Sequence, residues 1–330
     1  MRDDSAKCTI VLPVLNEESL IERISTELLS VFISVNINIL FVDDGSTDST
    51  WQKITDLSNK NTLIRGLRFS RNFGKESAML AGISYADGDC VIIMDADLQH
   101  PPKTALEMLN LWRNNDYEII EAIKIRRQDE KPLNSFCARA FYKVLHKLSG
   151  IDLHNASDFK LIDRSVAEIF ISMPERQTFF RAMAGWTGLK TGRVYFEVPH
   201  RAGGYTKFSL FKLTRMAVNS IAAYTSMPMH LVTITGMVFF LFAVFMSIQT
   251  LYMKICGKAA GGFTTVIILQ LLIGSILMIS LGVIGIYISK IYNEVKFRPR
   301  YVLSETIGVK HTADSVRNLT NVYKASRSLP

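Results

Sequence analysis

The stretch of sequence that decides the fold is Cys90-Val91-Ile92-Ile93-Met94-Asp95-Ala96-Asp97, an apolar run that ends in two carboxylates. Because side chains alternate along a β-strand, carboxylates one residue apart can point the same way. Mg²⁺ and Mn²⁺ are commonly held by one or two carboxylates together with substrate phosphates. The stretch therefore predicts a buried strand, followed at the end of a sheet by two carboxylates that bind a metal ion and the phosphates of a substrate. A polar turn capped by Asp is the alternative.

Strand-like and helix-like segments alternate up to about residue 125. This alternation is typical of βαβ units and predicts an α/β domain with a mainly parallel, Rossmann-like sheet. In such sheets, ligands bind beyond the carboxyl ends of the strands. We expect strands at 9–14, 37–42, 63–69, 90–94, 119–125 and 190–198, and helices at 17–33, 49–58, 75–86 and about 177–185.

Polar clusters follow three of the predicted strands. Asn16-Glu17 follows the first, Asp43-Asp44-Gly45-Ser46 the second, and the Asp95–Gln99 cluster the fourth. Alone, the Asp43-Asp44 cluster is equally well explained as a cap and turn, because Asp, Gly and Ser favour such positions. Beside the Asp95 and Asp97 pair it favours a nucleotide site, in which a carboxylate accepts hydrogen bonds from a base or ribose.

Two long uncharged segments, Leu231–Met253 and Ala259–Ser289, account for the high apolar content of 48%. About 20 apolar residues are enough for a helix to cross a hydrocarbon core of about 30 Å. We therefore predict a transmembrane hairpin that turns at 254–263. Basic residues favour the cytoplasmic side and lie mostly outside the hairpin, at Lys207, Lys212, Arg215, Lys290, Lys296, Arg298 and Arg300, against Lys254 and Lys258 in the turn.

The remaining composition fits an intracellular, membrane-attached protein. The first apolar run, 8–15, is short and interrupted by Pro13, so we expect no cleavable signal and a bulk that stays in the cytoplasm. The four cysteines have no metal-binding spacing, which indicates reduced thiols. The net charge of +8 is explained by attraction to anionic lipid rather than to nucleic acid.

Residues 208–224 place apolar side chains on one face and Lys212, Arg215 and Asn219 on another. That pattern predicts a helix in the membrane interface, with an ordinary helix packed on the domain as the alternative. The predicted organisation is a cytoplasmic domain at 1–206, an interfacial helix at 207–228, a transmembrane hairpin at 229–291 with helices at about 231–253 and 264–289, and a cytoplasmic tail at 292–330.

As a set, the motifs resemble family 2 glycosyltransferases of the GT-A fold, and within them the polyprenol-phosphate glycosyltransferases. Bactoprenol glucosyltransferases resemble the chain most, and dolichol-phosphate mannose synthases are related. The resemblance covers about residues 7–300 and rests on Pro13-x-x-Asn16-Glu17, Val42-Asp43-Asp44-Gly45-Ser46, Ser70-Arg71-Asn72-Phe73-Gly74-Lys75-Glu76, Asp95-Ala96-Asp97-Leu98-Gln99-x-Pro101-Pro102, Asp158-Phe159-Lys160-Leu161-Ile162-Asp163-Arg164, Met173-Pro174-Glu175-Arg176, Gly185-Trp186-Thr187-Gly188 and the hairpin.

The resemblance implies the following roles. Asp158 would be the catalytic base or would orient an Arg or the metal, and Asp97 would be the second catalytic carboxylate. The nucleotide-sugar would be bound by Pro13, Glu17, Asp43, Asp44, Asp95, Ala96, Gln99, Arg201 and Lys207; a Mg²⁺ or Mn²⁺ ion by Asp95, Asp97 and Gln99; and the acceptor phosphate by Lys124, Arg127 and Arg139.

Two positions depart from the family pattern. Residue 124 is Lys where relatives usually carry Arg, and a Lys cannot bind a phosphate through two parallel hydrogen bonds. Residue 160 is Lys in a motif that is usually Asp-Phe-Arg.

The resemblance implies an inverting, metal-dependent hexosyltransferase in the bacterial cytoplasmic membrane, multi-pass, with its catalytic domain in the cytoplasm. Its sugar donor would be UDP-glucose and its acceptor undecaprenyl phosphate. A flippase partner and a homo-oligomer are compatible with this interpretation. The alternatives are another sugar (N-acetylglucosamine, galactose, mannose or aminoarabinose), a processive polysaccharide synthase, and a non-catalytic scaffold or translocation partner. Gln177, Arg181 and Trp186 have the wrong spacing for the synthase motif.

Overall fold

The computed structural model describes residues 2–3, 5–125, 157–173, 180–197, 227–256, 262–296 and 298–309. The chain forms two compact units. One comprises Met1–His146, Gly150–Thr206 and Phe297–Pro330, and the other comprises Lys147–Ser149 and Lys207–Lys296. The predicted interfacial helix at 208–224 lies outside the described residues and stays a prediction.

The first unit is built on an eight-stranded sheet in the order β7-β5-β6-β4-β1-β2-β3-β8. Strands β1 to β4 run parallel, and β5 runs parallel to β7, whereas β6 and β8 are antiparallel to their neighbours. The predicted α/β fold with a mainly parallel sheet is therefore confirmed. The strands are β1 (Cys8–Val14), β2 (Ile37–Asp43), β3 (Ile64–Phe69), β4 (Cys90–Ile93), β5 (Ile119–Lys124), β6 (Lys160–Asp163), β7 (Thr191–Phe196) and β8 (Leu303–Ile307).

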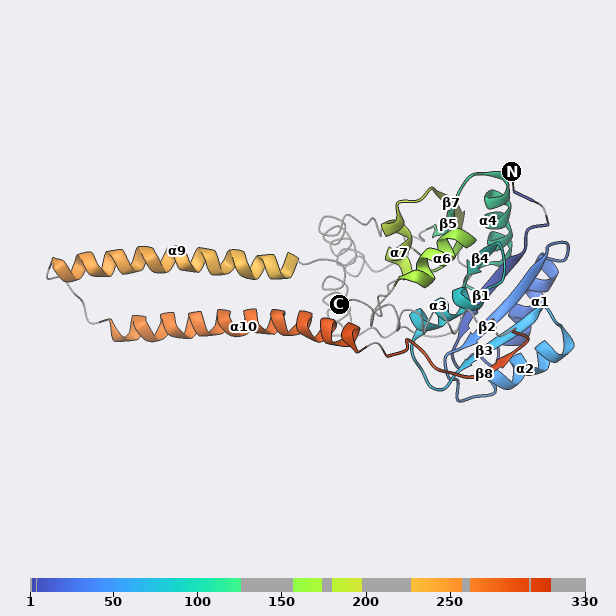
Figure 1. Ribbon diagram of the computed structural model, residues 1–330, viewed down its shortest axis with the longest axis horizontal. Helices are drawn as coiled ribbons and strands as arrows, with labels where there is room; N and C mark the ends of the chain where they lie inside the picture. Colours follow the sequence, from blue (N-terminus) through green and yellow to red (C-terminus); the bar gives the residue numbers. More distant parts are fainter. Residues whose placement is uncertain are drawn as a thin grey trace, which may run out of the picture. The chain divides into compact units, whose positions relative to one another are not determined.

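Helices cover both faces of this sheet because its central strands are apolar on both sides. Side chains of α1, α2 and α4 pack in one buried cluster, and those of α3, α6 and α7 pack in a second. Figure 1 labels these elements along the chain. Their bounds are α1 (Ile21–Val31), α2 (Thr50–Lys60), α3 (Lys75–Tyr85), α4 (Pro102–Asn114), α6 (Arg164–Ser172) and α7 (Phe180–Thr187).

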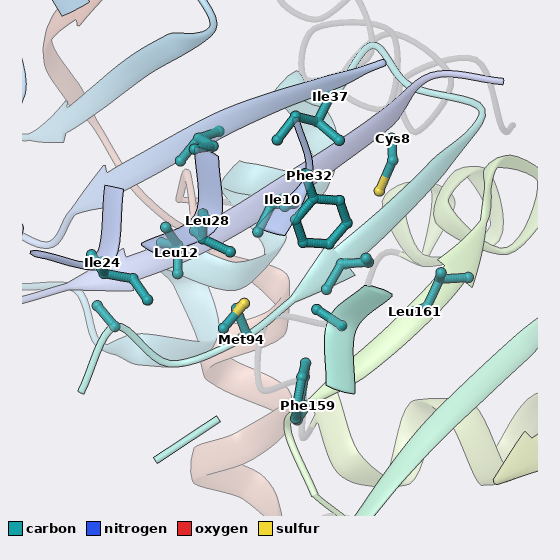
Figure 2. Packing of buried hydrophobic residues seen from close by; sticks show 14 of the residues in the cluster. Cys8, Ile10, Leu12, Ile24, Leu28, Phe32, Ile37, Met94, Phe159 and Leu161 are labelled. Carbon is teal, nitrogen blue, oxygen red and sulfur yellow. The ribbon is translucent and has the colours of Figure 1, made fainter. Parts of the chain in front are cut away.

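Strand β1 shows how the sequence builds this core. Cys8, Ile10 and Leu12 alternate into the first cluster, where Figure 2 shows them with Leu28 of α1, whereas Val11 belongs to the second cluster. Period-two alternation places successive side chains on opposite faces of the strand. Since both faces are buried, the strand reads as one continuous apolar run in the sequence.

Strand β8 is absent from the sequence prediction, which places only a tail from residue 292 onward. It pairs antiparallel with β3, with Gly66 opposite Ile307 and Arg68 opposite Glu305. Its sequence, Leu-Ser-Glu-Thr-Ile, is short and half exposed. An edge strand of this kind has no strong apolar pattern, and it forms because β3 offers unpaired backbone groups.

The second unit contains two long helices that lie side by side, α9 (Met227–Ile255) and α10 (Phe263–Val295) (Figure 1). Val232–Met253 and Leu272–Val295 are long and apolar enough to cross a membrane, with mean hydropathies of 2.0 and 2.2. Large apolar side chains are exposed on both helices, among them Phe240 and Ile279. Extended apolar surface of this kind marks a membrane or protein contact.

Candidate active site

The carboxyl edge of the sheet gathers residues that are far apart in the sequence. Strands β1, β2 and β4 end at this edge because they are parallel. Strand β6 is antiparallel to β4, with Lys160 opposite Ile93, so it begins at the same edge. Asp95 and Asp97 follow β4, and Asp158 lies two residues before β6, so all three are placed at the same edge.

Asp158 is the centre of an ion-pair cluster at this edge. Arg181 of α7 donates from Nε to Oδ1 at 2.8 Å and from Nη2 to Oδ2 at 2.9 Å. Lys75, the first residue of α3, places its Nζ 2.9 Å from Asp158 Oδ2 and 2.6 Å from Asp95 Oδ1. Two cations thus hold Asp158, and one of them bridges it to the carboxylate that follows β4.

These contacts keep Asp158 ionised although it is buried. Burial alone would raise the pKa of Asp158, but the hydrogen bond from Arg181 and the charges of Lys75 and Arg181 outweigh it and hold the pKa well below its usual range. The neighbouring Glu76 differs, because burial raises its pKa to about 7 while a hydrogen bond from the backbone N–H of Phe180 opposes the shift. Two adjacent carboxyl groups therefore have opposite tendencies, set by whether a cation touches them.

The Asp43-Asp44 pair ends β2 and shapes the neighbouring loop. Asp44 accepts hydrogen bonds from the backbone N–H groups of Phe73, at 2.7 Å, and Gly74, at 2.9 Å. Gly45 has φ +76° and lies against the backbone of Arg71, where a Cβ atom would be 2.6 Å from the carbonyl carbon. Only glycine fits so close an approach in that conformation. Asp44 and Gly45 therefore fix the loop that leads into α3.

Asp43 is fully buried and only partly satisfied. Its Oδ1 accepts from the backbone N–H of Ser46 at 2.9 Å, whereas its Oδ2 has no hydrogen-bond partner among the described residues. The Nε atom of Arg68 is 3.5 Å from that oxygen. Burial raises the pKa of Asp43, against the hydrogen bonds of Ser46 and the charge of Arg68. An open acceptor in a buried position is the chemistry that a ligand N–H or O–H group requires.

The turn after β4 is held by hydrogen bonds from its backbone N–H groups to its own side chains. The N–H of Gln99 donates to Asp97 Oδ1 at 3.1 Å, and Leu98 has a positive φ of 59°. A left-handed conformation is uncommon for leucine and is found where the surroundings demand it. His100 accepts at Nδ1 from the N–H of Asp95 at 2.9 Å, and its ring stacks on Phe159 with 4.6 Å between centroids.

The donors at this edge suit a hard divalent cation. Burial raises the pKa of Glu17, and the negative charges of Asp97, Asp48 and Asp95 raise it further. Electrostatic repulsion therefore acts between Glu17 and these three carboxylates. Among the described residues, no group of three or more His, Cys, Asp or Glu side chains is placed to hold a metal by itself. Two carboxylates together with substrate oxygens and water are a usual ligand set for Mg²⁺, and the metal role of Asp95 and Asp97 stays a prediction.

Of the other predicted site residues, some lie at the carboxyl edge of the sheet and others lie outside the described residues. Pro13 lies in β1 opposite Val42, at the same edge, and Ala96 is buried in the turn after β4. Lys124 ends β5 and is exposed at this edge. Arg127, Arg139, Arg201 and Lys207 lie outside the described residues, so their roles stay predictions.

Lys160 does not belong to the exposed site. It is fully buried and pairs with Glu121 of the adjacent strand β5. Burial lowers the pKa of Lys160, and the charge of Glu121 opposes this shift. The Lys found where the family usually has Arg therefore forms an ion pair between β5 and β6.

Sequence reasoning assigned no role to Lys75, Arg181 or His100. Lys75 lies within the Ser70–Glu76 motif, which is a signal that could have drawn attention to it. Arg181 carries no such signal, because its contact with Asp158 depends on how α7 packs near the start of β6. His100 contacts the backbone of Asp95 only five residues away, but it is the unspecified position of the Asp95–Pro102 motif.

Comparisons with known proteins show the family of this chain. The family model described as Glycosyl transferase family 2 matches residues 9–170. A glycosyltransferase of Synechocystis sp. is 36% identical, over 92% of this chain and 96% of that protein. A prophage bactoprenol glucosyl transferase homolog of Escherichia coli is 34% identical over 90% and 98%, and the bactoprenol glucosyl transferase of Shigella phage SfV is 32% identical over 90% and 98%.

Solved structures show the same fold at greater distance. Glucosyl-3-phosphoglycerate synthase from Mycobacterium tuberculosis, in complex with Mn²⁺, uridine diphosphate and glucosyl-3-phosphoglycerate, superposes with a TM-score of 0.50. It is 20% identical and covers 66% of this chain and 78% of that chain, a likeness that supports the fold alone. The relatives above 30% identity span nearly the whole chain, and with them the chain belongs to glycosyltransferase family 2.

Proposed function

We propose that this glycosyltransferase moves glucose from UDP-glucose to a polyprenyl phosphate at a membrane surface. The observation that carries the proposal is the similarity, over nine-tenths of the chain, to proteins named bactoprenol glucosyl transferase. The match spans both the acidic edge of the sheet and the two apolar helices. A soluble sugar-phosphate acceptor gives such helices no role, whereas a lipid acceptor lies in the membrane that they would cross.

The carboxyl edge can bind the leaving diphosphate of the sugar donor. Breaking the bond between sugar and diphosphate builds negative charge on the leaving oxygen, which fixed cations stabilise. Asp95 and Asp97, with Gln99 beside them, would hold Mg²⁺ or Mn²⁺, and the bound ion would neutralise charge on the diphosphate. Lys75 already contacts Asp95 and supplies a second positive charge at the same place.

The acceptor needs little help from a base. A phosphate monoester has its second pKa near about 6 and is mostly dianionic at pH 7. Its oxygen would form a bond to the anomeric carbon while the bond to the diphosphate breaks, and the electron pair would leave with UDP. No proton has to be removed, and the anomeric configuration is inverted.

Asp158 therefore acts as a positioning residue in this proposal. Its two partners, Lys75 and Arg181, hold it as an anion, and an anion with so low a pKa is a weak acceptor of protons. In return, the carboxylate fixes both cations beside the diphosphate and the incoming phosphate. Of the two roles considered for Asp158, we therefore propose the orientation of neighbouring cations rather than catalysis as a base.

The two apolar helices would place the reaction at a membrane. Val232–Met253 and Leu272–Val295 suit transmembrane spans by length and composition. In this proposal, they hold the chain in the bacterial cytoplasmic membrane with the catalytic unit on the cytoplasmic side. Lys124, Arg127 and Arg139 would bind the acceptor phosphate, and Arg201 and Lys207 would close over the diphosphate. A flippase partner and a homo-oligomer stay predictions from the sequence.

Transfer of label to lipid tests the proposal. Membranes containing the full chain, given radiolabelled UDP-glucose and undecaprenyl phosphate, should form an organic-extractable, acid-labile labelled lipid. Asp97→Asn should lower the rate about 100-fold or more, because it removes a charge that the metal–diphosphate complex needs. Asp56→Asn is a matched control, since Asp56 bonds only Gln52 on the exposed side of α2 among the contacts described.

Each outcome has a distinct meaning. Equal labelling by Asp97→Asn would contradict the metal–diphosphate role of Asp97. Labelling from UDP-N-acetylglucosamine or UDP-galactose instead of UDP-glucose would change the sugar but keep the reaction. Absence of labelling with every UDP-sugar would favour a non-catalytic scaffold.

A further inference from the structure

The chain that leaves α10 returns to the catalytic unit and joins its sheet. Residues 296–302 connect α10 to β8, which Figure 1 shows in red beside β3. The Tyr301 ring stacks on Phe69 with 5.0 Å between centroids, and the N–H of Ser70 donates to the carbonyl of Val302 at 2.9 Å. The segment from Tyr301 to Ile307 is therefore bonded to β3 and to the start of the loop that follows it.

Glu305 of β8 uses both oxygens of its carboxylate. Oε1 is 2.8 Å from Arg68 Nη1, and Oε2 accepts from Trp51 Nε1 at 2.9 Å. Hydrogen bonds from Arg68 and Trp51 lower the pKa of Glu305, so the carboxylate stays ionised. One side chain from the C-terminal strand thus joins β3 to α2.

Glu305 makes the shortest of the contacts that place the Arg68 guanidinium, which also donates from Nη2 to the carbonyl of Ser46 at 3.5 Å. Arg68 extends over the Trp51 ring, 5.9 Å from its centroid, and its Nε stays 3.5 Å from Asp43 Oδ2. At that distance the guanidinium compensates the buried charge of Asp43 but forms no hydrogen bond with Oδ2. An arginine freed from Glu305 could advance and occupy this acceptor, since charge-assisted bonds to carboxylates are favourable.

We propose that Glu305 is a positioning residue of the nucleotide subsite. By holding Arg68 back, it leaves Asp43 Oδ2 open to the N–H of a pyrimidine base. The inference rests on the proposed function, because it takes the ligand to be a uridine nucleotide. It assigns a role in substrate binding to a strand that follows the apolar hairpin in sequence.

Steady-state kinetics and binding of uridine diphosphate to the purified full chain test the inference. Glu305→Gln keeps the shape and one acceptor but removes the charge that holds Arg68. The KM for UDP-glucose and the Kd for uridine diphosphate should rise about fivefold, with kcat within about twofold of the wild type. In an Arg68→Met background, Glu305→Gln should have no further effect, since Glu305 acts through Arg68.

The control is Glu168→Gln, which removes an exposed ion pair with Arg164 in the same unit, at 3.2 Å, and should change neither constant. Unchanged KM and Kd in Glu305→Gln, or equal effects with and without Arg68, would overturn the inference while leaving the transferase activity intact. A lower unfolding temperature with a proportional loss of kcat would also overturn it, as a structural effect. A wild type that binds no uridine diphosphate would overturn it together with the proposed sugar donor.

Discussion

At the amino edge of the sheet, Asp87 has a partner for each oxygen, whereas at the carboxyl edge Asp43 has one oxygen without a hydrogen-bond partner among the described residues. Asp87 receives Lys7 Nζ at 2.8 Å, Arg65 Nη1 at 2.9 Å and Asn38 Nδ2 at 3.0 Å. Asp43 Oδ2 forms no hydrogen bond within the described part of the chain. The same residue type is closed to ligands at one edge and open to them at the other.

The pKa values follow the same division. Burial opposes ionisation of Asp87, but hydrogen bonds from Lys7 and Arg65 outweigh it and lower its pKa to about 2. At the carboxyl edge, burial dominates and raises the pKa of Asp43, and it raises that of Glu76 to about 7. The two edges thus differ in whether cations or burial dominate the pKa of a carboxyl group. Asp158 lies between these cases, because its partners are cations that a substrate phosphate could also engage.

The largest expected effect is on Asp158, where the comparison is least clear. Asp158→Asn leaves the charges of Lys75 and Arg181 without their shared anion, so both should lose their positions. We expect kcat for lipid labelling to fall about 100-fold, as when one fixed electrostatic contact is removed from an active site. The unfolding temperature should change little if Asp158 serves the reaction rather than the fold.

Asp116→Asn controls for the loss of an ion pair, because Asp116 pairs with Lys190 at 2.7 Å on the exposed surface. If Asp158→Asn kept the wild-type kcat, the proposed role of Asp158 in the reaction would be contradicted. Asp158 would then be a structural carboxylate, like Asp87.

An intermediate effect is expected for Glu76→Gln. The quantity to measure is the free energy of unfolding as a function of pH. A carboxyl whose folded pKa is raised to about 7 stabilises the fold fully below its unfolded pKa, and this contribution is lost as pH rises through about 7. Glu76→Gln stays neutral, so at pH 8 it should be more stable than the wild type by about 2 kcal/mol. At pH 4 the two should unfold alike. Parallel stability profiles from pH 4 to pH 8 would contradict the raised pKa.

The smallest effect is expected at the amino edge. Asp87→Asn should lower the free energy of unfolding by about 1 kcal/mol at pH 7, a modest value because the side chain is 45% exposed and its ion pairs are screened. The wild type should lose this contribution as pH falls from about 4 to about 2, since a lowered pKa stabilises only above the unfolded value. Lipid labelling by Asp87→Asn should match the wild type. If Asp87→Asn reduced lipid labelling without lowering stability, Asp87 would also serve the reaction. The functional difference between the two edges of the sheet would then be contradicted.

Much of the fold could be predicted from the sequence because its signals are local. The run Cys90–Ile93 is apolar enough to be a buried strand, and the polar clusters after β1, β2 and β4 mark where those strands end. The hairpin helices follow from length and composition alone. Strand β8 could not be predicted, because Leu303–Ile307 is short and half exposed, and only its pairing with β3 makes it a strand.

The site divides in the same way. By itself, the sequence placed Asp43, Asp44, Asp95 and Asp97 at the ends of strands, and the family resemblance added Asp158; the roles of these carboxylates stay predictions. Only the tertiary structure decided which of them are held by cations, which by backbone N–H groups, and which keep an open oxygen. Lys75, Arg181 and Glu305 enter through contacts between residues 23 to 254 positions apart. Such contacts depend on strand order and helix packing, and no local pattern encodes them.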